Sequence, residues 1–230
     1  MNFGPGRMSP AHRSVIKKKG YKKAIHSYRH GKIQWADKQL AGMRIDLRKS
    51  LRAQQSGRCY FCRQLVLQER RNACEDIEHY LDKSKLHYRK WTFSPVNLTI
   101  ACHPCNLQKG NRDLGDAAIR GSTSLRVGSG SFRWLHPYFD DYHRNIEIHP
   151  GWVYAVKASA PKAAEAAAML RDLELDQIER IQQTRQRYVD LLERTVVLMD
   201  KLIERNEVNK PRMKKLTAIL KTLKDELRWA

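Results

Sequence analysis

Apolar residues recur at helical spacing over residues 35–55, with Arg and Lys on the opposite face. The repeat consists of Trp35, Leu40, Met43, Leu47 and Leu51. Gly57 follows and is expected to end this helix. Two short runs after it are typical of strands: residues 77–80, which are expected to end one strand, and the apolar residues 98–101. The pattern therefore predicts one helix leading into a small α+β core.

The end of the chain has a longer helical pattern. Ser159-Ala160-Pro161 predicts a helix start, because proline is tolerated in the first turn. The repeat that follows is Ile178, Ile181, Arg185, Tyr188, Leu192, Thr195, Met199 and Leu202, and a last helix is expected from Pro211. Arg185 and Thr195 interrupt the repeat, which favours a hairpin packing locally over a free coiled coil. An assembly face is the alternative, and the oligomeric state stays open.

The segments between these helices are less regular. Residues 1–10 contain Gly and Pro without periodicity and are expected to be mobile, and residues 11–34 to order on a partner. Residues 121–131 are rich in Gly and Ser and predict a surface loop. Residues 132–157 are aromatic and predict a hairpin or an irregular cover. We expect four parts: a basic arm (1–34), a core with its lead-in helix (35–115), the cover (116–160) and a helical region (161–230).

Charge indicates the kind of partner. The formal net charge is +20, and residues 1–60 carry 15 Lys and Arg against 2 Asp and Glu. Such an excess points to a polyanion such as DNA or RNA. Aromatic residues alternate with the cations of the arm, which suits bases and phosphates. The candidate phosphate-binding cations there are Lys17, Lys18, Lys19, Lys22 and Lys23. A solubilising tail and a dock for an acidic protein are the alternatives.

A membrane is the rival polyanionic partner. No apolar run reaches spanning length, and no charged-then-apolar signal segment opens the sequence. We therefore expect no membrane association and a cytoplasmic location.

Four cysteines form two Cys-x-x-Cys pairs, 59/62 and 102/105. Each short pair lets two thiolates reach one ion, and two pairs complete a tetrahedral site. Zn²⁺ suits four thiolates best, and a site with four protein ligands is structural. Disulfides are the alternative, which a cytoplasmic location disfavours. Cys74 is left over as a free thiol, and His103, inside the second pair, is expected to be a turn residue near phosphate.

Oxygen and nitrogen ligands are interleaved with these cysteines. Glu78-His79 ends the first predicted strand, and Asn97-Leu98 opens the second. Asn106 follows the last cysteine and is expected to open a short helix, with Lys109 one turn further on. Two strands and a helix held by a metal knuckle would bring these side chains together.

This series resembles the HNH, or ββα-metal, endonucleases. Their motif is an acid–His pair, then Asn-Leu, then Cys-x-x-Cys followed by His or Asn and a Lys. The match covers about a quarter of the chain. It departs in having Glu78 where Asp is commoner and Asn106 where His is commoner.

The resemblance implies a role for each matched residue. His79 would be the general base. Glu78 and Asn106 would bind one Mg²⁺ or Mn²⁺ ion. Asn97 would hold the loop and orient His79 through its carbonyl, and Lys109 would meet a phosphate. Asp76 is either a further ligand or a solvated strand-edge carboxylate.

A narrower resemblance extends beyond this motif. The runs Ile77-Glu78-His79-Tyr80-Leu81-Asp82-Lys83 and His136-Pro137-Tyr138-Phe139-Asp140-Asp141 are similar to the PtuB-like HNH effectors of Septu and retron anti-phage systems. The resemblance implies an SMC-like or AAA-like ATPase partner. For the second run we expect turn capping and aromatic packing, with another metal site as the alternative.

Together these features predict a bacterial endonuclease that hydrolyses DNA with little sequence specificity, because no base-reading motif is evident. An RNA substrate such as tRNA is one alternative, since Lys, Arg and aromatic residues suit both nucleic acids. A non-catalytic, zinc-dependent nucleic-acid-binding subunit is the other.

Overall fold

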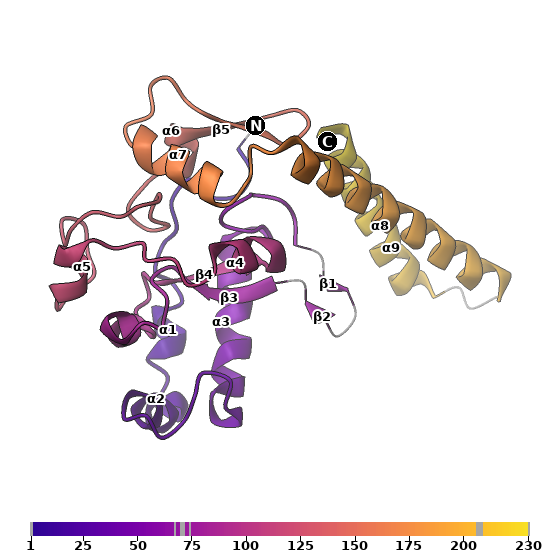
Figure 1. Ribbon diagram of the computed structural model, residues 1–230. Coiled ribbons are helices and arrows are strands. Elements are labelled where there is room, and N and C mark those ends of the chain that lie inside the picture. The colour runs from indigo at the N-terminus through magenta and orange to yellow at the C-terminus, as the bar shows by residue number, and fades with distance from the viewer. Residues whose placement is uncertain (1, 67, 70–71, 74, 206–208, 230) are drawn as a thin grey trace. The chain divides into compact units, whose positions relative to one another are not determined.

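The computed structural model describes residues 2–66, 68–69, 72–73, 75–205 and 209–229. It is a mixed α+β structure with small two-stranded sheets, which confirms the α+β part of the predicted fold class (Figure 1). The chain divides into two compact units. The first comprises Met1–Ile146 and Val156–Leu173, and the second comprises Glu147–Ala155 and Glu174–Ala230. Cys74, the unassigned cysteine, lies outside the described residues.

The basic N-terminal segment is folded within the first unit, whereas residues 11–34 were expected to order only on a partner. It forms α1 (Arg13–Ile16), η1 (Lys19–Tyr21), α2 (Lys22–Arg29) and η2 (Lys38–Leu40). Apolar residues interspersed among the cations explain this order, because Val15, Ile25 and Tyr28 are buried. Before α1, the Met8 N–H donates to the Pro137 carbonyl at 2.9 Å.

The lead-in helix α3 (Ala41–Gln54) begins six residues later than predicted. The Asp37 carboxylate accepts a hydrogen bond from the Gln39 N–H at 2.9 Å and starts η2, so the chain turns before α3. Met43 and Leu47 are fully buried as the repeat predicted. Trp35, which the repeat assigned to the helix, lies instead in the preceding turn.

Both predicted core strands are confirmed. β3 (Glu75–His79) pairs antiparallel with β4 (Leu98–Cys102), with His79 opposite Leu98. α4 (His103–Lys109) follows β4 directly, so Asn106 lies within that helix rather than opening it. The Gln55 side chain joins the end of α3 to β4: its amide donates to the Ile100 carbonyl at 2.8 Å and accepts from the Ile100 N–H at 2.7 Å.

The rest of the chain before residue 178 forms other short elements. They are β1 (Gln68–Glu69), β2 (Asn72–Ala73), η3 (Leu86–Trp91), α5 (Ala117–Gly121), α6 (Tyr142–Asn145), β5 (Ile146–His149), β6 (Val153–Val156) and α7 (Ala163–Asp172). Of these, β5 and β6 lie mainly in the second unit. Residues 122–131 contain neither helix nor strand, as their composition predicted. Aromatic residues hold the 132–142 segment to the core, since the Tyr80 hydroxyl donates to the Trp134 carbonyl at 2.7 Å and Tyr138 donates to the Leu98 carbonyl at 2.5 Å.

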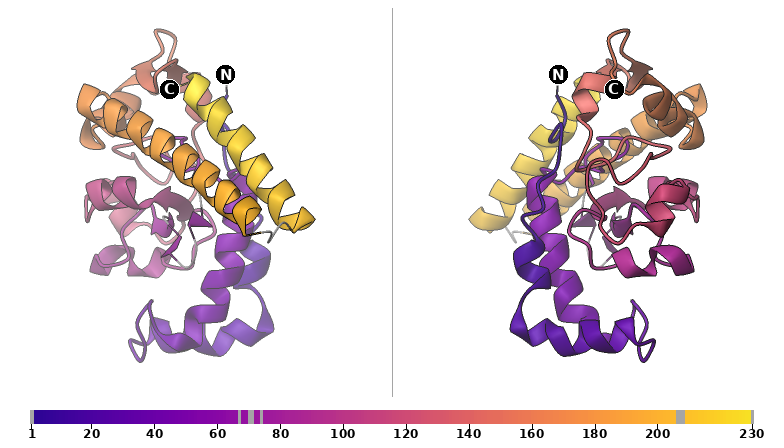
Figure 2. Two further views of the ribbon diagram at one scale, coloured as in Figure 1. Left: turned by 90° about the vertical axis from the view of Figure 1, so that its right-hand side faces the viewer. Right: turned by 90° about the vertical axis from the view of Figure 1, so that its left-hand side faces the viewer.

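The second unit is built mainly from two long helices, α8 (Ile178–Glu204) and α9 (Lys210–Trp229). They lie side by side in both views of Figure 2. Tyr188, Leu202 and Leu223 are buried between them, and the Tyr188 hydroxyl donates to the Glu226 carboxylate at 3.3 Å. None of the described helices is both long enough and apolar enough to cross a membrane.

Candidate functional site

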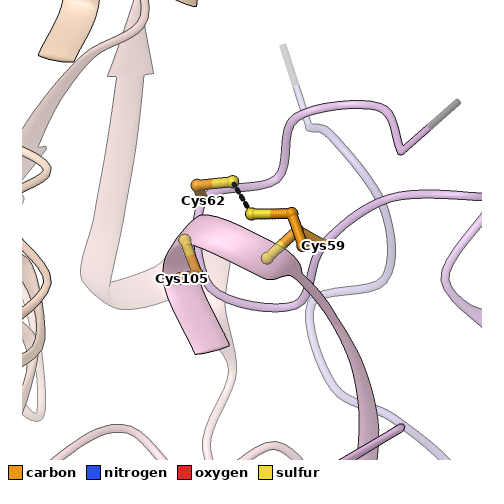
Figure 3. Close-up of side chains that lie close together, drawn as sticks. Cys59, Cys62 and Cys105 are labelled. Carbon is orange, nitrogen blue, oxygen red and sulfur yellow. Dashed lines mark hydrogen bonds between the residues drawn. The ribbon is translucent and has the colours of Figure 1, made fainter. Parts of the chain in front are cut away.

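Four buried cysteines from two distant segments converge in the first unit. The sulfur atoms of Cys59, Cys62, Cys102 and Cys105 all lie within 4.8 Å of one another. Figure 3 shows three of these side chains pointing toward one another. The Cys62 and Cys102 sulfurs are 3.8 Å apart, close to the separation of about 3.8 Å expected for thiolates around tetrahedral zinc. The cluster is therefore compatible with a metal ion such as zinc.

Local backbone geometry builds each half of the cluster. In the first half, Arg63 adopts a left-handed conformation (φ 61°), and the Cys59 N–H donates to the Gln64 carbonyl at 3.0 Å. The Arg63 guanidinium is buried against the rings of Tyr60 and Tyr142, 4.7 and 3.9 Å from their centroids, and this cation–π contact holds the strained turn. In the second half, the strand-to-helix junction between β4 and α4 supplies both thiols.

The four thiols cannot all ionise without a compensating cation. The pKa values of the Cys62 and Cys105 thiols are raised well above the ordinary value for cysteine, mainly because both thiols hydrogen-bond with Cys102. A divalent ion would supply the missing positive charge.

A cleft of about 490 Å³ opens over β3 and α4. Its lining combines the two strand carboxylates, the candidate base and the candidate amide ligand with three cationic side chains. The residues concerned are Trp35, Arg44, Arg48, Asp76, Glu78, His79, Lys83 and Asn106. The structure thus brings Glu78, His79 and Asn106 to one cleft, as the sequence predicted.

Asp76 and Glu78 make different contacts at this cleft. The Asp76 carboxylate accepts a hydrogen bond from the Asn106 side-chain N–H at 2.9 Å and lies 3.0 Å from Nδ1 of His103. Glu78 instead forms an ion pair of 2.5 Å with the Lys109 ammonium group. Asp76 is thus a cleft residue with two polar neighbours, and its side chain stays 36% exposed to solvent.

Lys109 is buried, contrary to the expectation that it meets a phosphate. Its side chain is 1% exposed, and its ammonium group also donates to the His79 carbonyl at 3.1 Å. Burial raises the pKa of Glu78, and the positive charge of Lys109 acts in the opposite direction. The lysine therefore stabilises a buried carboxylate next to the candidate base.

His79 is 2% exposed and packs against aromatic residues. Neither ring nitrogen makes a hydrogen bond of normal geometry with a described residue, although the Thr92 backbone lies close enough to act against the fall in the His79 pKa. Burial, assisted by the charges of Lys83 and Lys109, lowers the pKa of His79 well below its ordinary value. The imidazole is therefore neutral at pH 7.

Asn97 holds the loop that leaves β3. Its side-chain oxygen accepts from the Leu81 N–H at 2.7 Å, and its amide N–H group donates to the Leu81 and Trp91 carbonyls at 3.1 and 3.2 Å. Its backbone carbonyl accepts from the Tyr80 N–H at 2.9 Å rather than contacting the His79 ring. Asn97 therefore orders the backbone beside His79.

Replacing Asn97 with alanine should lower the free energy of unfolding by about 2–4 kcal/mol, because three buried backbone groups lose their partners. Urea unfolding of the metal-loaded protein measures the loss. Asn145→Ala is a useful comparison, since Asn145 is also buried but lies in α6, away from the cleft. A loss below about 0.5 kcal/mol for Asn97→Ala would contradict the structural role argued here.

The cations of the N-terminal segment do not line the cleft. Lys17, Lys19, Lys22 and Lys23 are exposed, and Lys18 forms an ion pair of 2.5 Å with Asp46. The cations at the cleft are Arg44, Arg48 and Lys83, which the sequence analysis did not select. Lys83 follows the acid–His pair by only a few residues, and this proximity in sequence could have indicated that Lys83 lies at the cleft.

The second motif run packs inside the first unit. His136 is buried and stacks on Phe139 with ring centroids 3.9 Å apart, and Asp140 accepts from the His136 N–H at 2.7 Å. Asp141 caps α6. Among the described residues, only the cysteine cluster gathers three or more potential His, Cys, Asp or Glu ligands. These contacts favour the capping and packing role over another metal site.

Comparisons with protein-family models, with curated proteins and with solved structures gave no match to this chain. Its function is therefore argued from the chemistry of the cysteine cluster and the cleft.

Proposed function

We propose that the protein is a metal-dependent endonuclease that hydrolyses DNA, with β3, β4, α4 and a structural zinc ion forming an HNH core. The observation that carries this proposal is the convergence of His79, Glu78, Asp76 and Asn106 on one cleft beside four clustered cysteines. Carboxylates and an amide suit a hard divalent cation, and a neutral imidazole suits proton removal from water.

His79 is the proposed general base. Its neutral imidazole retains a lone pair, and no hydrogen bond of normal geometry within the described residues occupies either ring nitrogen. The surrounding aromatic residues exclude bulk water from most of the ring, so only a water molecule in the cleft would reach it.

Glu78 and Asn106 are the proposed ligands of a catalytic Mg²⁺ or Mn²⁺ ion, with Asp76 as an additional oxygen donor. Asn106 donates to Asp76 through its nitrogen, so its amide oxygen remains suited to a cation. When bound, such an ion would polarise the scissile phosphate and stabilise the leaving oxygen. Glu78 is paired with Lys109 on one oxygen, which keeps the carboxylate charged in a buried place.

The proposed zinc ion has a structural role. Asn106 follows Cys105 directly in α4, and Cys102 ends β4, so an ion on these thiols would fix the strand-to-helix junction. The four cysteines would fill all four coordination positions of the zinc ion, which leaves no open position for catalysis.

Electrostatics support a nucleic-acid substrate. Arg44, Arg48 and Lys83 line the cleft together with the carboxylates of Asp76, Glu78 and Asp82, and the whole chain carries a formal charge of +20. Phosphate contacts would dominate affinity, so binding should weaken strongly with salt and depend little on sequence. RNA remains the second candidate substrate. A role in anti-phage defence with an SMC-like or AAA-like ATPase is supported by the sequence resemblance alone.

Incubation with supercoiled plasmid tests this proposal. We expect nicking with Mg²⁺ or Mn²⁺ and none with EDTA, because the divalent ion is needed at the cleft. His79→Ala should remove cutting while the affinity for DNA stays unchanged, since the ring does not provide the phosphate-binding charge. Nicked and linear products are quantified on gels, and affinity is measured separately at several salt concentrations.

Two controls make the result decisive. Each variant must retain one zinc equivalent and a wild-type unfolding curve, and His26→Ala, an exposed histidine outside the cleft, should cut normally. Equal cutting by wild type and His79→Ala would refute the assignment of the base. Binding without cutting of plasmid or structured RNA would favour the non-catalytic subunit.

A further inference from the structure

Trp35 is an aromatic residue at the cleft that no motif selected. It lies in the turn before η2, is half-buried and lines the same cleft as the carboxylates and Asn106. Its ring meets the His79 ring edge-to-face, with centroids 4.6 Å apart and an interplanar angle of 84°. It also contacts Phe93 at 5.9 Å. The indole is thus the cleft-side neighbour of the candidate base.

Arg44 fixes the turn that carries this indole. One guanidinium nitrogen donates to the carbonyls of Trp35 and Asp37, the latter at 2.9 Å, and the other donates to the Ala36 carbonyl at 3.1 Å. Three consecutive backbone carbonyls are therefore held by one side chain from α3. Among the described residues Arg44 has no acidic partner within ion-pair distance. Its positive charge therefore interacts with these carbonyls and with the cleft that it lines.

The Thr92 backbone is a polar neighbour of the His79 ring, but neither ring nitrogen makes a hydrogen bond of normal geometry with a described residue. Packing therefore contributes much of what sets the ring orientation. Edge-to-face contact restricts the rotation of an aromatic side chain more than contact with aliphatic groups does. The backbone on the other side of His79 is already held by β4 and by Lys109. Trp35 lines the cleft and packs on the ring, so this contact restricts the rotation that the backbone leaves free.

We propose that Trp35, clamped by Arg44, is the positioning residue that holds the His79 imidazole in place at the cleft. The catalytic consequence rests on the proposed nuclease function, whereas the contact itself does not. Arg44 acts through Trp35, because it holds the turn and not the imidazole.

Chemical modification tests the contact without any substrate. The zinc-loaded full chain is treated with diethylpyrocarbonate at fixed pH, and the rate at each histidine is measured by mass spectrometry. His79 should be protected in wild type and Trp35→Phe, and should react in Trp35→Ala at a rate approaching that of exposed histidines. Arg44→Met should give an intermediate loss of protection. The exposed residues His26, His30 and His103 serve as internal standards in every variant.

Kinetics then test the consequence. Trp35→Ala should lower kcat about 10- to 100-fold with little change in KM, because a misplaced base slows the reaction without weakening binding. Trp35→Phe should restore most of this loss. Adding Arg44→Met to Trp35→Ala should cause no further fall in kcat, since both changes act on one contact, but should raise KM, because Arg44 also supplies positive charge at the cleft. Lys49→Met, which removes an exposed charge from α3 outside this cleft, should leave kcat unchanged.

Each contrary result has a distinct meaning. Equal reactivity of His79 in wild type and Trp35→Ala would overturn the proposal. So would a rise in KM at constant kcat, which would make Trp35 a nucleotide-stacking residue instead. If protection follows the expected series but the wild-type protein cuts neither plasmid nor structured RNA, the contact is upheld and the non-catalytic subunit is favoured over the nuclease.

Discussion

Replacing Cys102 with serine should remove bound zinc and unfold the first unit under conditions where the wild-type protein is stable. Metal binding to four thiolates contributes on the order of 10 kcal/mol to folding in small zinc sites. Here the ion would join two cysteine pairs that are separated by 39 intervening residues, from Cys62 to Cys102. Zinc content is measured by elemental analysis, and unfolding by urea titration with and without a chelator.

The fifth cysteine offers a matched control. Cys74→Ser makes the same chemical change but lies outside the proposed ligand set, so this variant should retain one zinc equivalent and wild-type stability. Chelation should destabilise the wild type and Cys74→Ser equally, and should have no further effect on Cys102→Ser. An unfolding midpoint of Cys102→Ser equal to that of the wild type would contradict a structural metal at this cluster.

Lys109→Met should lower the free energy of unfolding by about 3–5 kcal/mol, the usual cost of leaving one member of a buried ion pair unpaired. Glu78 and the His79 carbonyl would both lose their partner in this variant. The double variant Lys109→Met with Glu78→Gln removes both charges, so it should regain much of that loss. Urea unfolding of the four proteins of this cycle, all zinc-loaded, measures the coupling.

Lys49→Met provides the matched control, because it removes an exposed lysine from α3 by the same substitution. Its effect should stay within about 0.5 kcal/mol. If Lys109→Met were equally mild, the ammonium group would not be the buried partner of Glu78. It would then be free to meet a phosphate, as the sequence resemblance first implied.

Local patterns were sufficient for several parts of this protein. The strands that became β3 and β4, the main part of α3 and the four clustered cysteines were all predictable. Hydrophobic periodicity and Cys-x-x-Cys spacing involve only residues close together in sequence, so what they predict does not depend on how distant segments pack. Helix starts were less accurate, because caps such as Asp37 compete with the apolar repeat.

Local sequence patterns could not predict the solvent accessibility of each charged or aromatic side chain. Lys109 matches a motif position expected to meet phosphate, yet it is buried on Glu78. The N-terminal cations were selected by their density, but the cleft is lined by Arg44, Arg48 and Lys83. Burial depends on which distant segments pack together, and spacing along the chain carries no information about that.

The sequence by itself determined the α+β class, the cysteine set and the identity of the acid, histidine and amide groups, since each follows from residue type and short-range spacing. Only the tertiary structure decided that Asp76 joins Asn106, that Lys109 neutralises Glu78 and that Trp35 packs on His79. These contacts link residues 30 or more positions apart, and they form because burying a charge or an aromatic ring requires a partner that the folded chain brings to it.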